Sequence, residues 1–225
     1  GSADLVLLKE REGFFETVKK VLPFSAKKLF IEEYDLKLVE YLRLKKLLFP
    51  IQIKHLKDQV YNLRLRKDLE EIKRLKKAQE LTAKVLEKAV RFLKENFSKG
   101  LTEKDLASVM VSETPNLEFA EPSFDPIVAY GPNSAIPHHK SSKQKIGEGV
   151  LLIDLGVRYK GYCGDLTRTF YLGKPDEKFL QRYEFVQKAL NKAIDEVKSR
   201  KKFIDIHNLA VGIFKEKNLH DKFLH

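Results

Sequence analysis

The stretch at residues 150–170 has the sequence VLLIDLGVRYKGYCGDLTRTF. Two apolar segments flank a short turn at Tyr159-Lys160-Gly161, where the glycine gives the backbone the freedom to reverse. One acidic residue interrupts each segment, Asp154 in the first and Asp165 in the second. The pattern predicts a β-hairpin that carries a carboxylate on each strand.

Residue numbering predicts which face of the hairpin each aspartate occupies, because side chains alternate between the two faces of a strand. A hairpin whose loop has an even number of residues pairs positions whose numbers sum to an odd value, and 154 and 165 do so. We therefore expect Asp154 and Asp165 to share a face, directly opposite or diagonal to each other. A single β-bulge would break this relationship.

Two carboxylates on one face of an apolar hairpin repel each other unless a cation lies between them, and burying either one alone costs free energy. Oxygen ligands favour hard ions such as Mn²⁺ or Mg²⁺. A carboxylate pair can also bridge two metal ions about 3.5–4 Å apart. The alternative interpretation is that one aspartate pairs with Arg168 or caps a turn. The residues alone leave both interpretations open.

Strand and helix patterns alternate before the hairpin, which predicts an α/β fold class. In residues 3–62 we expect a partial α/β domain with strands at 5–8, 28–32 and around 51–53, and helices at 14–21 and 35–48. We expect residues 63–225 to form a second domain. It opens on a long helical pattern at 64–97, for which a coiled coil is the competing interpretation.

The rest of the second domain contains shorter elements. Thr102 and Asp105 have the spacing of a capping box for a helix that continues through Val111. A strand is expected at 127–129, and further helices are expected from Pro175 and at 204–217. In the first of these two helices, the apolar residues that we expect to face inward are Phe179, Tyr183, Val186, Leu190, Ile194 and Val197.

Composition narrows the class of protein. The 225 residues are 43% hydrophobic and 33% charged, and no apolar run approaches the roughly 20 residues that a membrane-spanning helix needs. The single cysteine, Cys163, fits a reducing cytoplasm. The net charge of +11 could attract nucleic acid, but the basic residues alternate with Glu on helical faces and lack interleaved aromatics. We expect a cytoplasmic protein without membrane or nucleic-acid partners.

The hairpin motif resembles the Xaa-Pro aminopeptidase and prolidase family of metallopeptidases, which shares the pita-bread fold with methionine aminopeptidase and creatinase. The segments at 124–129 and 131–138 resemble the family's stretch that ends in an active-site histidine, and residues 63–72 resemble its entry into the catalytic domain. The resemblance covers residues 64–225 and implies that the second domain, residues 63–225, is the N-terminal portion of the pita-bread catalytic domain. Residues 3–62 are similar only in general character to the family's N-terminal domain.

The resemblance implies a role for four residues. Asp154 and Asp165 match the first two of five metal ligands, with Asp154 chelating one ion and Asp165 bridging two. His138 matches a histidine that contacts the substrate or stabilises the tetrahedral intermediate, although a surface loop histidine is the alternative. His225 matches a substrate-side histidine, and His139 is expected to be incidental.

The family's other three ligands, one His and two Glu, are expected beyond residue 225. We therefore expect a chain truncated at both ends, with two of the five ligands, that is inactive alone. The resemblance implies two divalent ions, with Mn²⁺ expected and Co²⁺ or Zn²⁺ as alternatives, and a hydroxide that these ions activate.

The expected function is that of an aminopeptidase that cleaves between an N-terminal residue and a following proline. A proline dipeptidase and a non-catalytic pita-bread binding module are the alternatives. The substrate would be a peptide with proline at the second position. The resemblance also implies that the full-length protein is a homo-oligomer.

Overall fold

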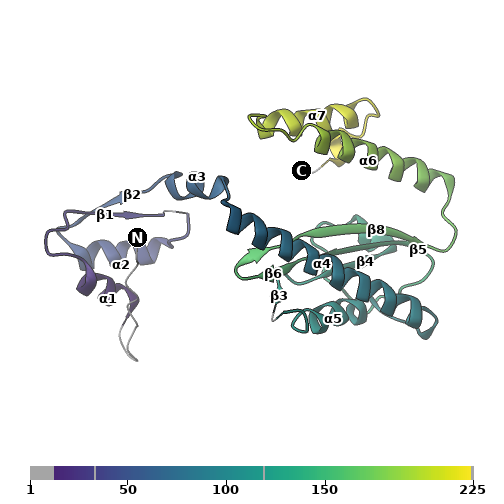
Figure 1. Ribbon diagram of the computed structural model, residues 1–225, viewed down its shortest axis with the longest axis horizontal. Helices are drawn as coiled ribbons and strands as arrows, with labels where there is room; N and C mark the ends of the chain where they lie inside the picture. The colour runs from purple at the N-terminus through teal and green to yellow at the C-terminus, as the bar shows by residue number, and fades with distance from the viewer. Residues whose placement is uncertain (1–12, 33, 119, 224–225) are drawn as a thin grey trace. The chain divides into compact units, whose positions relative to one another are not determined.

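The computed structural model describes residues 13–32, 34–118 and 120–223 (Figure 1). The chain divides into two compact units, residues 1–72 and 73–225. The domain boundary expected at residues 62–63 stays a prediction, and the strand expected at residues 5–8 lies outside the described residues.

The first unit contains a small parallel sheet. Its elements are α1 (Phe14–Val21), β1 (Lys28–Ile31), α2 (Leu38–Leu48), β2 (Gln52–His55) and α3 (Gln59–Leu65). β1 and β2 run parallel, and α2 provides the crossover connection that parallel strands require. The strands and helices expected within residues 14–53 are therefore confirmed, with small shifts of their bounds.

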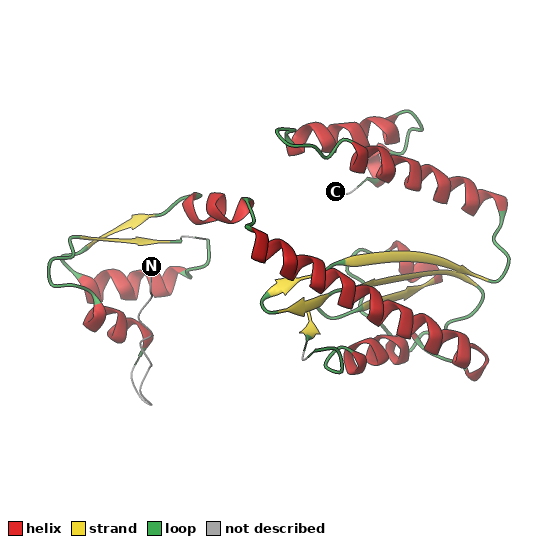
Figure 2. Cartoon of the chain, in the orientation of Figure 1, coloured by secondary structure: helices red, strands yellow, loops and turns green. Residues whose placement is uncertain are grey.

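The second unit is entered through α4 (Leu69–Asn96), a single long helix. The elements that follow are shown in Figure 2: η1 (Phe97–Lys99), α5 (Glu103–Glu113), β3 (Glu121–Pro122), β4 (Ile127–Tyr130), η2 (Gly131–Ala135), β5 (Gly149–Leu155), β6 (Val157–Tyr159), β7 (Tyr162–Cys163), β8 (Leu166–Leu172), α6 (Glu177–Asp195), α7 (Phe203–Lys215) and η3 (His220–Lys222).

The predicted capping box at the start of α5 is confirmed. The backbone N–H of Asp105 donates to the hydroxyl of Thr102 at 3.2 Å, and the backbone N–H of Thr102 donates to the Asp105 carboxylate at 3.0 Å. The two residues thus satisfy backbone N–H groups that the first turn leaves without partners. This cap fixes where α5 begins, and Glu103 is the first residue after it.

Two three-stranded antiparallel sheets form the body of the second unit, with strand orders β4-β5-β8 and β3-β6-β7. β5 lies between β4 and β8, so it is the central strand of the larger sheet. β5 and β6 follow each other with only Gly156 between them, and β7 and β8 are separated by Gly164 and Asp165. The predicted hairpin therefore crosses from one sheet into the other at these residues.

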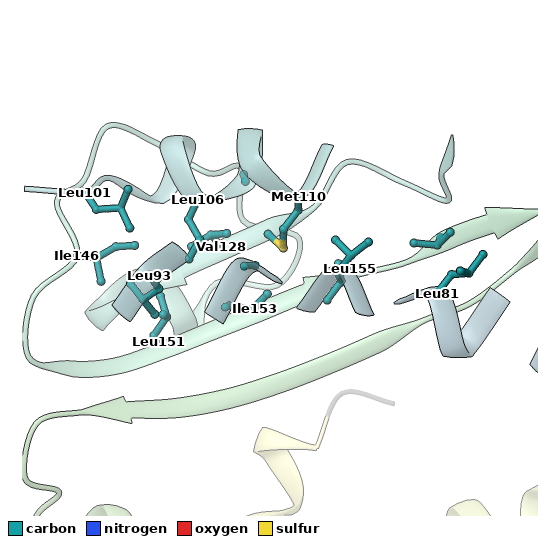
Figure 3. Close-up of a cluster of buried hydrophobic side chains, with 14 of the residues drawn as sticks. Leu81, Leu93, Leu101, Leu106, Met110, Val128, Ile146, Leu151, Ile153 and Leu155 are labelled. Atoms are coloured by element: carbon teal, nitrogen blue, oxygen red, sulfur yellow. The ribbon is translucent and has the colours of Figure 1, made fainter. Parts of the chain in front are cut away.

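The hydrophobic core lies between α4, α5 and one face of the larger sheet (Figure 3). Leu151, Ile153 and Leu155 alternate along β5 and are almost completely buried. They meet Leu81 of α4 and Met110 of α5. Because α4 buries its apolar stripe in this core, it behaves as an ordinary amphipathic helix rather than as a strand of a coiled coil.

The expectation that α6 turns its apolar stripe inward is wrong for five of the six predicted residues, and only Phe179 is half-buried, with its ring 4.8 Å from that of Tyr171. Tyr183, Val186, Leu190, Ile194 and Val197 are between 40% and 66% exposed. The face that packs against α7 is a different one. It is marked by Phe185, whose ring lies 5.1 Å from that of Phe214, and by the buried Ala189.

Among the described residues, no helix is long and apolar enough to cross a membrane.

Candidate metal and catalytic site

The hairpin register places the two aspartates diagonally. Asp154 lies opposite Thr167 in the β5–β8 ladder, so Asp165 stands two residues earlier on the facing segment. The β6–β7 ladder continues the same register across the turn, with Arg158 opposite Cys163. The expected shared face is thus confirmed, and of the two arrangements left open, directly opposite or diagonal, the register gives the diagonal one. Arg168 donates to the carbonyl of Thr167, at 2.8 Å, rather than to either aspartate.

The segment that carries Asp165 is held against α4. The backbone N–H of Val157 donates to the hydroxyl of Thr82 at 3.0 Å, and that hydroxyl donates to the carbonyl of Ala78 at 2.8 Å. The backbone N–H of Asp165 donates to the side-chain oxygen of Gln79 at 3.2 Å. Gly164 packs so closely on this turn of α4 that a Cβ there would approach the Ala78 carbonyl oxygen to 2.8 Å.

Burial raises the pKa of Asp154 above its usual value, and the neighbouring Asp165 raises it further. Two contacts act in the other direction. The Thr167 hydroxyl donates to Oδ1 of Asp154 at 2.8 Å, and the positive potential of His138 also lowers the pKa. The pKa of Asp154 is raised on balance, so the charge of the half-buried carboxylate is only partly compensated, and a bound cation would complete the compensation.

Asp154, Asp165 and His138 line one cavity of about 890 Å³. The wall that α5 contributes is formed by Lys104, by the small residues Ala107 and Ser108, and by Val111 and Ser112. The segment at 124–127 contributes Phe124 and Pro126. The structure therefore brings together the three described residues that the sequence assigned to the site. The fourth, His225, lies outside the described residues.

His138 and His139 are neighbours with different surroundings. His138 is exposed and has a left-handed backbone conformation, with φ of 53°. The His139 side chain is only 11% exposed, and its Nε2 lies 2.9 Å from Oε2 of Glu103. His139 was expected to be incidental, but the structure places it in a buried polar network.

Glu103 is the centre of this network, and its side chain is fully buried. Its Oε1 accepts hydrogen bonds from the backbone N–H of Tyr130, at 2.7 Å, and from Nδ2 of Asn133, at 2.9 Å. Its Oε2 accepts from the backbone N–H and the hydroxyl of Ser142, at 3.0 and 2.7 Å, besides facing His139.

Two opposing effects set the pKa of Glu103. Burial raises it, but the hydrogen bonds from Asn133, His139, Tyr130 and Ser142 together outweigh burial and lower the pKa to about 2. The carboxylate is therefore ionised and can only accept hydrogen bonds. It follows that Nε2 of His139 carries a hydrogen.

The donor set suits a hard divalent ion, since Asp154 and Asp165 offer carboxylate oxygens and the charge of Asp154 is only partly compensated. It is also incomplete. Among residues 13–32, 34–118 and 120–223, no group of three or more His, Cys, Asp or Glu side chains could hold a metal ion. The two aspartates would therefore hold an ion only with ligands from elsewhere or from water.

Comparison with known proteins gives consistent results. Residues 73–225 match the model of metallopeptidase family M24. The chain is 34% identical over 176 residues to the Xaa-Pro dipeptidase of Pyrococcus furiosus, a match that covers 77% of this chain and 49% of the relative. The chain thus spans about half the length of that curated relative.

Solved structures of two similar proteins resemble the chain along most of its length. A prolidase from Thermococcus sibiricus matches with a TM-score of 0.82 and 30% identity, over 100% of this chain and 61% of that one. An X-Pro aminopeptidase from Thermotoga maritima matches with a TM-score of 0.80 and 27% identity, over 95% of this chain and 60% of that one. The expected mixed α/β fold of the prolidase type is confirmed.

Proposed function

Because the chain belongs to metallopeptidase family M24, we propose that it forms part of a metal-dependent peptidase that cleaves the bond before proline. The observation that carries this proposal is the placement of Asp154, Asp165 and His138 around one cavity. The first form of the activity that we propose is the removal of an N-terminal residue from a peptide with proline at the second position.

In this proposal the two aspartates share one task and His138 has another. Asp154 and Asp165 would hold two divalent ions, with Mn²⁺ as the proposed metal, together with ligands that the described residues do not supply. When bound, such ions lower the pKa of a water molecule and polarise a carbonyl group. The exposed ring of His138 donates a hydrogen bond to the carbonyl oxygen of the substrate as negative charge develops there.

Neighbouring groups support these tasks. The hydroxyl of Thr167 occupies Oδ1 of Asp154, which fixes the carboxylate and leaves Oδ2 for an ion. Phe124 and Pro126 give the cavity an apolar wall against which a proline ring can pack. A peptide bond before proline lacks the amide hydrogen that ordinary peptidases recognise, so shape and carbonyl contacts must provide the recognition.

The chain by itself is proposed to be inactive and to bind metal weakly, because its described residues offer so few ligands. Two assays test the proposal. Titration of the chain with Mn²⁺ should broaden NMR signals of residues around Asp154 and Asp165, and Asp154→Asn should abolish this broadening. The chain should release no N-terminal residue from an Xaa-Pro peptide with Mn²⁺ present, and release that depends on Mn²⁺ would contradict the proposed inactivity.

A proline dipeptidase is the second candidate, and the lysines of the cavity favour it. Lys104 and Lys140 line the same cavity as the aspartates, and a dipeptide substrate carries a free carboxylate that such cations attract. In a form of the protein that hydrolyses Xaa-Pro bonds, Lys140→Gln should raise KM for Xaa-Pro dipeptides about tenfold if this carboxylate is recognised. It should leave KM for longer peptides unchanged. An equal effect on both substrates would favour the aminopeptidase.

A further inference from the structure

We propose that Glu103 is the positioning residue for His138. Its buried carboxylate holds the loop between β4 and β5 so that His138 faces Asp154 across the cavity. This inference rests on the role proposed for His138 above. Glu103 contacts neither the proposed substrate position nor the aspartates, and it acts through the loop.

The contacts of the Glu103 carboxylate are distributed over residues 130–142, the first part of the loop between β4 and β5. They reach the end of β4 at Tyr130, the helical turn at Asn133, the residue after His138, and Ser142 beyond it. A single carboxylate thus connects four points within thirteen residues of chain. Glu103 directly follows the Thr102 cap and is the first residue of α5, so its own backbone is fixed by that helix.

The backbone of His138 shows why this anchoring matters. A φ of 53° is uncommon for a residue with a side chain, and such a conformation persists only where the surroundings enforce it. The Glu103 network holds His139 directly after it. With His139 turned toward Glu103, the left-handed step at His138 leaves the His138 ring exposed at the cavity. His139 thus anchors the loop to Glu103, and His138 is left free to face the cavity.

The chemistry of the network makes Glu103→Gln an informative variant. All five groups at the carboxylate are donors, and a glutamine offers one acceptor oxygen and one NH₂ group. Asn133, His139 and the Ser142 hydroxyl could each reorient to accept. The backbone N–H groups of Tyr130 and Ser142 lie on opposite oxygens, so either orientation of the glutamine leaves one of them without an acceptor.

NMR on the isotopically labelled chain tests the proposal in two independent ways. Without metal, the left-handed conformation of His138 gives a strong NOE between its own amide and Hα protons, and Glu103→Gln should lose it. With Mn²⁺ added, the paramagnetic broadening of the His138 ring relative to the Thr167 methyl should fall severalfold in Glu103→Gln. Glu113→Gln removes a charge from the other end of α5 without touching the cap, the loop or the cavity, and it should behave like the wild type in both measurements.

Each outcome decides the question. An unchanged His138 NOE and an unchanged broadening ratio in a folded Glu103→Gln variant would overturn the positioning role. If Glu103→Gln does not fold, Asn133→Ala removes one donor and leaves the carboxylate satisfied by the others, and it should show the same changes to a smaller degree. If Mn²⁺ broadens neither His138 nor Thr167 in the wild type, the proposed metal site fails while the NOE still tests the inference.

Discussion

The hydroxyl of Thr167 donates a 2.8 Å hydrogen bond to Oδ1 of Asp154, directly across the β5–β8 ladder. A partner of this kind orients a metal ligand, and its loss typically lowers metal affinity 10- to 100-fold. The bond also lowers the pKa of Asp154, and so keeps the carboxylate available to an ion.

Replacing Thr167 by Val should therefore weaken the binding of Mn²⁺ to the chain by about tenfold at neutral pH. Titration calorimetry or the EPR signal of free Mn²⁺ would measure this. Thr167→Ser keeps the hydroxyl and should retain the affinity. Thr169→Val is the matched control, since Thr169 lies on the same strand opposite Leu152. Equal weakening by the valine substitutions at 167 and 169 would contradict the orienting role.

The raised pKa of Asp154 predicts that Asp154→Asn stabilises the metal-free chain. Below the usual value of 3.8 the carboxyl is protonated in both the folded and unfolded states, and it costs nothing. As the pH rises through the folded pKa, the folded state must ionise a group that burial and Asp165 disfavour, so stability is lost. Asparagine removes this loss and retains Oδ1 for Thr167.

We expect the gain to be about 0.5–1 kcal/mol at pH 7, kept small because the side chain is partly exposed and screened. Thermal unfolding in EDTA at several pH values would show it. The difference between variant and wild type should vanish near pH 3 and grow as the pH rises toward neutrality. A variant that is less stable at every pH would show that Asp154 supports the fold rather than straining it.

Glu103 predicts the opposite dependence on pH. Its folded pKa of about 2 lies below the usual value of 4.5, so its contribution to stability is present above pH 4.5 and is lost as the pH falls toward 2. Glu103→Gln should lower the free energy of unfolding by about 2–4 kcal/mol at pH 7, because a buried network loses one of its two acceptor oxygens and its charge. The deficit should shrink between pH 4.5 and pH 2.

Glu113→Gln serves as the control for this comparison. Glu113 forms a partly exposed ion pair with Lys88 at 2.6 Å, a kind of contact that contributes about 0–1 kcal/mol. Chemical denaturation of both variants would separate the buried network from a surface ion pair. If both variants lost the same small amount of stability, the central role assigned to Glu103 in the fold would be wrong.

The local features of the fold were predictable because neighbouring residues encode them. The capping box at Thr102 and Asp105 needs only a spacing of three, and the shared face of Asp154 and Asp165 needs only strand parity, whereas the register of the ladder made their placement diagonal. The apolar stripe of α6 was also correctly identified as a stripe. Its orientation was wrong, because periodicity shows which residues share a face and does not show what that face contacts.

The role of Glu103 could not be predicted in this way. In the sequence it is one more acidic residue beside Lys104, at the start of an amphipathic helix, where a solvated charge is the usual outcome. Its partners lie 27 to 39 residues further along the chain. The one local signal was its position directly after a strong N-cap.

The close contact between Gly164 and α4 provides a last prediction, on how the Asp165 segment is held. A Cβ at Gly164 would collide with the Thr82 hydroxyl and approach the Ala78 carbonyl oxygen to 2.8 Å. Neither atom lies at the far end of a long, flexible side chain, so neither can move away easily. Gly164→Ala should therefore destabilise the chain by about 1–3 kcal/mol, because the strand must move away from the helix. The same movement should weaken Mn²⁺ binding, since Asp165 is the next residue.

Gly212→Ala is the matched control. Gly212 lies inside α7, where a Cβ would meet nothing within 4 Å, so alanine should be neutral or stabilise the helix by up to about 1 kcal/mol. Thermal unfolding and Mn²⁺ titration of the two variants would give the comparison. If Gly164→Ala kept both the stability and the affinity of the wild type, the packing of this turn against α4 would not be what positions Asp165.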